Sequence, residues 1–168
     1  MGIDGAYWIE KLQLIKHPEG GAFREVYRSQ LTISKKNLPN GFGGSRDFAT
    51  SIYFLLEDRD FSAFHRIRSD ELWHFYSGDP LALFEIEAIS GRLTKHVLGR
   101  DPEKGEVFQT AIRAGNWFGA TLLNQGGYAL MGCTVSPGFD FEDFELGDKD
   151  LLTQNFPQHE KLIKTLTR

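Results

Sequence analysis

From residue 48 onward the chain consists of short apolar runs, each followed by a sequence that favours a turn. The runs are rich in β-branched and aromatic residues, which suit a pleated sheet. Turns that recur every 8–12 residues or so are typical of an antiparallel sandwich or barrel. The chain is therefore predicted to be an all-β protein. In order, the runs are FATSIYFLL, FSAFHRI, ELWHFYS, LALFEIEA, LTKHVLG, EVFQTAI, NWFGATLL and YALMGCTV.

Length and composition agree with a β-rich domain. The chain has 168 residues, of which 40% are hydrophobic and 25% charged, the balance of a soluble globular protein with one core. Aromatic residues make up 13% of the chain, and its 18 glycines outnumber its 6 prolines. We expect residues 1–168 to form a single domain, with a core over about residues 48–140.

The two ends of the chain have a different pattern. Apolar residues at helical spacing predict an N-terminal helix over about residues 5–15, with Asp4 as its cap. Residues 147–168 are expected to form a short helix followed by a second helix or a frayed tail. Between the first helix and residue 48, the stretch 34–47 is rich in turn signals and is the longest predicted loop.

Charge and cysteine content exclude several classes of protein. The net charge is −4 with both signs interspersed, so no basic surface for nucleic acid is expected. The longest apolar runs fall well below the roughly 20 residues needed to cross a bilayer. Cys133 is the single cysteine, so neither an intrachain disulfide nor a thiolate metal cluster can form. The first residues lack a secretory pattern, and a cytoplasmic location is the expectation.

The runs FSAFHRI and ELWHFYS carry the candidate chemistry. Strand alternation puts His65 on the same face as Ile67, and Glu71 on the same face as Trp73 and Phe75. A tight turn between the runs would bring His65 and Glu71 opposite each other, inside if their apolar neighbours mark the inside. A histidine and a carboxylate that converge among aromatic residues are candidates for acid–base chemistry or metal binding.

The opposite face of ELWHFYS carries Leu72, His74 and Tyr76, which by the same alternation point away from the interior. Apolar and aromatic residues on an outer face need cover from the chain itself or from a second subunit. We therefore expect a homodimer.

The spacing of His65, Glu71 and Gly78 resembles the first motif of the cupin superfamily, in which two histidines precede a glutamate and then a glycine. The chain departs from that motif at Ile67, where the second histidine is usual. In the run RAGNWFGATLL, which resembles the second cupin motif, Phe118 stands where a metal-binding histidine is expected.

A longer set of motifs resembles one branch of the cupins, the cupin five group, whose function is unknown. The resemblance extends over about residues 12–146 and implies a double-stranded β-helix, or jelly-roll barrel, with short terminal helices. Cupins are often dimers, and their barrel supports many unrelated reactions. The matching stretches are HPEGGAFREVYRS, SIYFLL, ELWHFYSGDPL, AGNWFGA and VSPGFDFEDFE.

The resemblance also bears on metal binding. Metal-binding cupins use a set of three histidines and one glutamate, of which this chain keeps only His65 and Glu71 at matching positions. Alternation turns His74 away from Glu71, so it is a poor substitute. Because stable transition-metal sites usually have three or four protein ligands, we expect no bound metal and no other cofactor.

Metal-free cupins that act on sugar nucleotides suggest an enzymatic role by analogy of fold. There a barrel histidine removes a proton next to a carbonyl group and a tyrosine supplies one. In this chain His65 would be the base and Glu71 would orient it and stabilise the imidazolium ion. The candidate acids are Tyr27, Tyr53 and Tyr128. The activity implied is a metal-independent isomerase or epimerase with a sugar-like substrate.

Three other interpretations stay open at this stage. His65 and Glu71 can bond to each other inside the barrel without any chemistry, the barrel can bind a small molecule without turnover, or the protein can be a weakly metallated cupin enzyme. Arg24 and Arg28, beside Glu25, can meet an anionic group at the barrel mouth or belong to a solvated strand face. Glu19 can approach a ligand or belong to an ordinary turn. The predicted ligand-binding residues are Arg24, Tyr53, Trp73, Phe75, Asn116 and Phe118.

Overall fold

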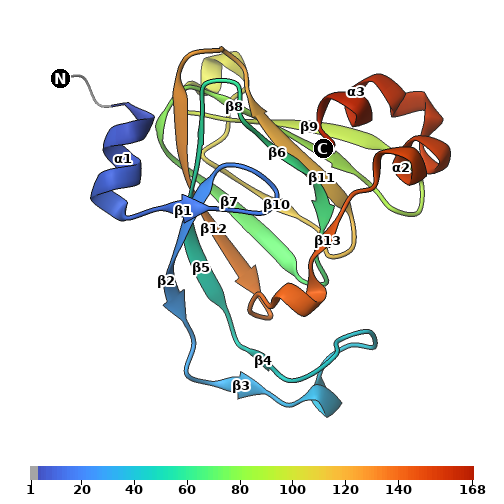
Figure 1. Ribbon diagram of the computed structural model, residues 1–168. Coiled ribbons are helices and arrows are strands. Elements are labelled where there is room, and N and C mark those ends of the chain that lie inside the picture. Colours follow the sequence, from blue (N-terminus) through green and yellow to red (C-terminus); the bar gives the residue numbers. More distant parts are fainter. Residues whose placement is uncertain (1–3) are drawn as a thin grey trace.

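The computed structural model describes residues 4–168 and has two antiparallel β-sheets that face each other (Figure 1). The first sheet contains most of the N-terminal half and the long strand β12. Its strands, in spatial order, are β1 (Ile15–Lys16), β2 (Ala22–Arg28), β5 (Thr50–Glu57), β12 (Tyr128–Ser136), β7 (Asp70–Gly78) and β10 (Gln109–Ile112).

The second sheet has five strands and closes the other side of the barrel. Every pairing between named strands in residues 4–168 is antiparallel, and sequence neighbours are often distributed between the two sheets. This is a jelly-roll arrangement, and it confirms the predicted fold class. The strands, in spatial order, are β13 (Glu145–Leu146), β6 (Phe61–Arg66), β11 (Trp117–Leu122), β8 (Leu81–Ile86) and β9 (Leu93–Leu98).

The main core lies between the sheets, and alternation along β7 shows how the sequence builds it. Trp73 and Phe75 are buried in this core, whereas Leu72 and Tyr76 are exposed on the outer face of the sheet. The predicted assignment of faces along this strand is therefore correct.

The expected hairpin between the two runs that carry His65 and Glu71 is wrong. Strand β6 belongs to the five-stranded sheet and pairs with β11 and β13, whereas β7 belongs to the six-stranded sheet and pairs with β12 and β10. The short connection between them passes from one sheet to the other. His65 and Glu71 consequently approach the interior from opposite walls of the barrel.

The N-terminal helix is shorter than expected. Helix α1 covers Gly5–Leu12, and the predicted cap is present, since the backbone N–H of Tyr7 donates to Asp4 Oδ1 at 2.8 Å. The helix ends at Leu12 because Gln13 adopts a left-handed conformation with φ of 55°. Ile15, the last residue of the predicted helix, begins strand β1 instead.

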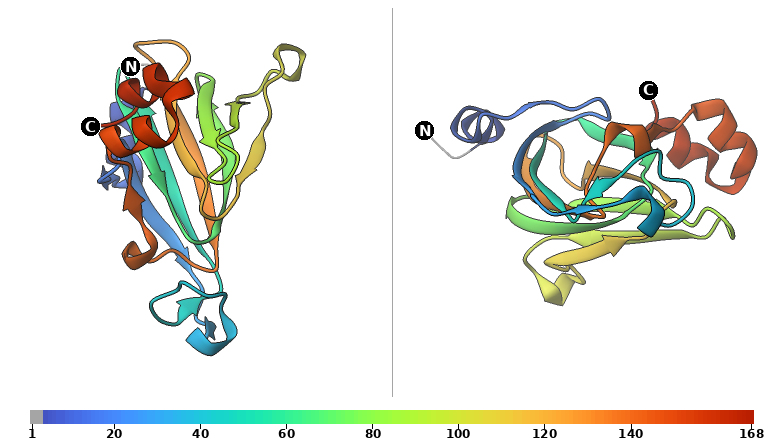
Figure 2. Two further views of the ribbon diagram at one scale, coloured as in Figure 1. Left: turned by 90° about the vertical axis from the view of Figure 1, so that its right-hand side faces the viewer. Right: turned by 90° about the horizontal axis from the view of Figure 1, so that it is seen from below.

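The C-terminal segment forms helices α2 (Lys149–Asn155) and α3 (Glu160–Thr165), which lie against the outer face of the five-stranded sheet (Figure 2). Buried Leu152 and Ile163 pack there with Phe64 of β6, so this segment is part of the packed structure and not a frayed tail. Short 3-10 turns occur at η1 (Lys35–Asn37), η2 (Pro102–Lys104), η3 (Phe141–Asp143) and η4 (Pro157–His159).

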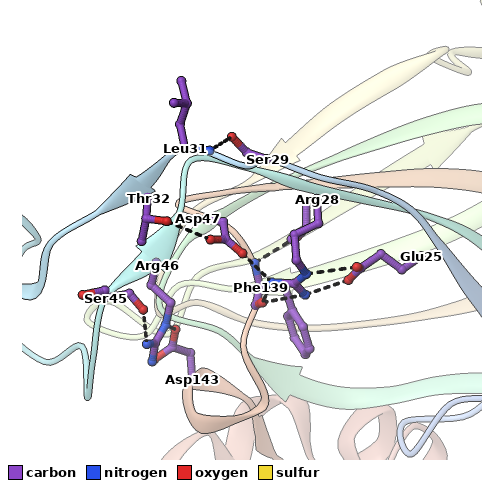
Figure 3. A network of polar contacts seen from close by, with 11 residues as sticks. Glu25, Arg28, Ser29, Leu31, Thr32, Ser45, Arg46, Asp47, Phe139 and Asp143 are labelled. Atoms are coloured by element: carbon purple, nitrogen blue, oxygen red, sulfur yellow. Dashed lines mark hydrogen bonds and ion pairs between the residues drawn. The ribbon is translucent and has the colours of Figure 1, made fainter.

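The predicted loop at 34–47 belongs to an arm that projects from the end of the barrel (Figure 2). In it β3 (Thr32–Ile33) pairs with β4 (Arg46–Asp47). The arm is attached to η3 by a buried ion pair, in which Arg46 Nε and Nη2 donate to the carboxylate of Asp143 at 2.6 and 2.9 Å (Figure 3). The arm therefore has a fixed position next to the segment that follows β12.

The helices of residues 4–168 are all too short or too polar to span a lipid bilayer.

Candidate functional site

A cavity of about 340 Å³ opens into the barrel between the two sheets. This volume is within the usual range for small-molecule sites. Its wall combines aromatic rings with ionisable groups. The aromatic members are Phe23, Phe54, Trp73, Phe139, Phe141 and Phe144. The ionisable members are His17, Glu19, Glu25, Arg28, His65, Glu71, Cys133 and Asp140.

A turn at HPEGG, just before β2, places Glu19 in the cavity. Gly20 has a φ of 115°, a conformation that favours glycine, and its N–H donates to the carbonyl of His17 at 3.1 Å. The turn rests on β6, because the N–H of Ala63 donates to the Glu19 carbonyl at 2.8 Å and the hydroxyl of Ser62 donates to Glu19 Oε1 at 2.7 Å. The Glu19 carboxyl group is consequently buried and fixed.

His65 lies beneath this carboxyl group. Its Nε2 atom is 3.1 Å from Glu19 Oε2, and its Nδ1 atom is 2.7 Å from the carbonyl oxygen of Ala63. Since a carbonyl oxygen can only accept, Nδ1 carries the proton of the neutral ring and Nε2 has the lone pair. The ring packs against Phe118, with 4.1 Å between ring centroids, and is almost fully buried.

Glu71 approaches from the other sheet, on β7. Its side chain is buried among apolar groups, with the thiol of Cys133 and the indole of Trp73 as neighbours. Burial raises the pKa of Glu71 to about 8, and repulsion from Glu19 adds to this effect. Glu71 is therefore protonated near neutral pH and can donate a hydrogen bond.

Burial also sets the charge of the other groups. Burial raises the pKa of Glu19 to about 6, although His17 and the hydrogen bond from Ser62 oppose the rise. Burial lowers the pKa of His65 to about 4, partly offset by its bond to the Ala63 carbonyl. The cavity thus holds a neutral imidazole next to one carboxyl group and a protonated second carboxyl group across from it.

The mouth of the cavity has a different composition. Arg28 donates two hydrogen bonds to the carboxylate of Glu25, at 3.0 and 2.7 Å, and one to Asp47 at 3.0 Å (Figure 3). A bulge at Val26 turns Arg28 to the same side as Glu25. Without the bulge, alternation would put Tyr27 on that face instead of Arg28.

Of the predicted ligand-binding residues, Trp73 lines the cavity. Its indole Nε1 is buried and has no hydrogen-bond partner among residues 4–168. Phe75 and Phe118 are buried in the core between the sheets and are not part of the cavity wall, although Phe118 supports the ring of His65.

The other three predicted ligand-binding residues lie away from the cavity. The side chain of Asn116 bonds to Glu85 and to the backbone of residue 88, because Asn116 lies in the turn before β11, where strand alternation does not apply. Arg24 bonds to the end of helix α1, at the Leu12 carbonyl and the Gln13 side chain. Tyr53 packs against another tyrosine on the outer face of the sheet.

The candidate acids Tyr27 and Tyr128 are also outside the cavity wall. Tyr27 is exposed, and the hydroxyl of Tyr128 bonds to Ser77. Neither tyrosine is placed to donate a proton to a ligand in the barrel.

Sequence reasoning gave too little weight to the HPEGG turn. His17 had no predicted partner, yet its Nδ1 accepts a hydrogen bond from the N–H of Glu19 at 3.3 Å and its ring stacks with Phe141. A clue was present, because a buried position for Glu19 explains why two glycines follow it directly. The partner of His65 could not be found by spacing, since the turn is far from β6 in the sequence.

The residues present do not fit a cupin metal site. Ile67 and Phe118 occupy the positions of two metal-binding histidines, and both nitrogens of His65 already face oxygen atoms of the protein. Within residues 4–168, no group of three or more histidine, cysteine, aspartate or glutamate side chains has the arrangement to hold an ion.

Solved structures of other proteins share the fold of this chain. Oxalate decarboxylase from Bacillus subtilis superposes with a TM-score of 0.54 at 15% sequence identity, over 90% of this chain and 36% of that chain. The likeness concerns the fold alone, and it places the chain among proteins with a cupin barrel.

More similar proteins define the family. The model described as "Cupin superfamily (DUF985)" matches residues 6–147, so the chain belongs to this family of cupins. The uncharacterised yeast protein YML079W (Saccharomyces cerevisiae) is 32% identical over an alignment of 154 residues, which covers 85% of this chain and 76% of that protein. A hypothetical protein from Leishmania major has a TM-score of 0.90 at 36% identity, over 98% of this chain and 99% of that chain.

Proposed function

We propose that the protein binds a small sugar-like carbonyl compound inside the barrel and isomerises or epimerises it by metal-independent proton transfer. One observation carries the proposal. A neutral imidazole next to a carboxyl group and a protonated carboxyl group line the same apolar cavity from opposite sheets. Such a pair supplies a base and an acid at the same pH.

In this reaction the Glu19 carboxylate takes a proton from the carbon next to the substrate carbonyl group and passes it to His65 Nε2, 3.1 Å away, so that the two groups act together as the base. Glu19 then stabilises the imidazolium ion that results. This is the role that the sequence predicted for Glu71. The Glu71 hydroxyl donates its proton to the carbonyl oxygen, which gives an enediol, and return of the proton to carbon from another direction or position gives the isomer.

Two donors support the negative charge that develops on the carbonyl oxygen. They are the Glu71 hydroxyl and the indole N–H of Trp73, which has no other partner in the described chain. Donors in a dry site stabilise an oxyanion more strongly than water does. Glu71 therefore replaces the tyrosine expected as the acid.

Deuterium exchange tests the proposal without knowledge of the natural substrate. A panel of small hydroxyketones and aldoses is incubated with the protein in D₂O, and exchange at the carbon next to the carbonyl group is followed by NMR. We expect exchange for at least one compound, and a loss of about 100-fold or more in the rate for His65→Ala and Glu71→Gln.

The matched control is Ile89→Ala, because Ile89 is on an exposed turn remote from the cavity. This variant should exchange at the wild-type rate. Exchange that persists in both cavity variants, or no exchange with any compound, contradicts the proposal.

A non-catalytic binding protein is the second candidate. It is favoured by the contacts of His65, whose two nitrogens both face protein oxygen atoms at 2.7 and 3.1 Å. In that case a ligand binds in the cavity and His65→Ala leaves its affinity unchanged, with no exchange in wild type or variant.

We further propose that the protein is a homodimer that uses the outer face of the six-stranded sheet. Tyr76 and Leu72 on β7 are exposed there, with 52% and 38% of their surface accessible. Adjacent exposed apolar side chains on a sheet favour association with a second copy.

A further inference from the structure

The wall of the cavity has more acidic than basic side chains. Four carboxyl groups belong to its wall, those of Glu19, Glu25, Glu71 and Asp140. In the described part of the chain, the guanidinium of Arg28 is the only lysine or arginine group in that wall.

Arg28 is already neutralised. It bonds to Glu25 and Asp47 at 2.7 to 3.0 Å, and to the carbonyl oxygen of Phe139 at 3.4 Å (Figure 3). These carboxylates raise its pKa further, so the charge is fixed and shared among them. An anionic ligand would find no available cation at the mouth.

The two imidazoles do not change this balance. Burial lowers the pKa of both His17 and His65, so neither ring is charged near neutral pH. Asp140 makes no ion pair among residues 4–168, and its Oδ1 only accepts the N–H of Glu142, at 2.8 Å. The cavity wall is therefore net negative, even with Glu71 protonated.

The deep end of the cavity offers hydrogen-bond donors. Trp73 is 1% exposed, and its Nε1–H has no acceptor in the described chain. A buried donor without a partner is costly, and a ligand oxygen would satisfy it. Phe139 and Phe141 also belong to the cavity wall, and aromatic rings can attract a cation.

We propose that the ligand of this cavity is a small carbonyl compound with a protonated amine, of the aminoketone or amino-sugar class. Its oxygen accepts from Trp73 and Glu71 at the deep end, and its ammonium group lies at the mouth next to Asp140. This inference rests on the proposed function for the site, and adds that the ligand is a cation.

Three phenyl ketones of nearly equal size test the charge preference. They are 2-amino-1-phenylethanone as its ammonium form, 2-hydroxy-1-phenylethanone and benzoylformate, which are cationic, neutral and anionic. Binding is followed through the indole N–H resonance of Trp73, assigned with Trp73→Phe. We expect the aminoketone to bind about tenfold more tightly than the hydroxyketone, and benzoylformate to bind most weakly.

Asp140→Asn is the matched variant, since the amide oxygen can still accept from the N–H of Glu142. It should remove most of the advantage of the aminoketone and leave the affinity for the hydroxyketone unchanged. Equal affinity for the aminoketone and the hydroxyketone, tightest binding of benzoylformate, or no saturable shift with the aminoketone overturns the inference.

The outcome is separate from that of the proposed function. Charge-selective binding without deuterium exchange would contradict the isomerase and keep the ligand class. Deuterium exchange of neutral hydroxyketones without tighter binding of the aminoketone would support the isomerase and contradict the cationic ligand class.

Discussion

At the scale of single residues, the burial of Glu71 makes the stability of the protein depend on pH. Its pKa in the folded protein is about 8, whereas the ordinary value is 4.5. The folded state therefore holds this proton over a range in which the unfolded chain releases it. The stability that Glu71 contributes is fully present below pH 4.5 and is lost as the pH rises toward 8.

Glu71→Gln should remove this part of the pH dependence, because the amide does not titrate. From the acid to the alkaline end of that range, the free energy of unfolding of the wild type should fall relative to the variant by roughly 3–5 kcal/mol. Urea unfolding at several pH values measures this difference. Parallel curves for the two proteins would show that Glu71 titrates normally.

His65 gives a second prediction at this scale. Because Nδ1 donates to the Ala63 carbonyl, the neutral ring should be the Nδ1–H tautomer. Two-dimensional ¹H–¹⁵N spectra of the imidazole should show a protonated Nδ1 and an unprotonated Nε2 between about pH 6 and 8. A ring protonated at Nε2 in this range would contradict the prediction, because Nε2 would then donate a hydrogen bond to Glu19.

At the scale of elements, the HPEGG turn decides the position of Glu19. A Cβ atom at Gly20 would collide with the backbone carbonyl oxygen of Phe61, so the turn would have to move off β6. Gly20→Ala should destabilise the protein by roughly 3 kcal/mol or more.

Gly126→Ala is the matched control. Gly126 also has a positive φ, of 86°, but a Cβ atom there meets nothing within 4 Å. It should cost only the backbone strain, about 1–2 kcal/mol. Thermal unfolding of both variants gives the comparison, and similar losses for the two would show that contact with Phe61 does not fix the turn.

At the scale of the whole molecule, the outer face of the six-stranded sheet is the expected dimer interface. Light scattering after size exclusion should give about twice the chain mass of 19.1 kDa for the wild type. Tyr76→Glu places a charge on that face and should give the monomer mass. Ile89→Glu, at an exposed turn, should leave the dimer intact. A monomeric wild type would contradict this prediction.

Local patterns in the sequence predicted much of the fold, including which side chains of a strand are buried. The alternation along β7 correctly separated Trp73 and Phe75 from Leu72 and Tyr76. The same rule failed at Val26, where a bulge adds one residue, and at Asn116, which lies in a turn. Alternation holds only where a strand continues without interruption.

The cupin family and its jelly-roll barrel were predicted from the resemblance of sequence motifs, and period-two alternation, which is local, predicted the inward faces of the strands that carry His65 and Glu71. Packing of the barrel makes Glu19 the neighbour of His65 and buries Glu71 enough for it to keep its proton. Proximity between distant segments and exclusion of water are properties of the packed barrel, so no spacing along the chain encodes them.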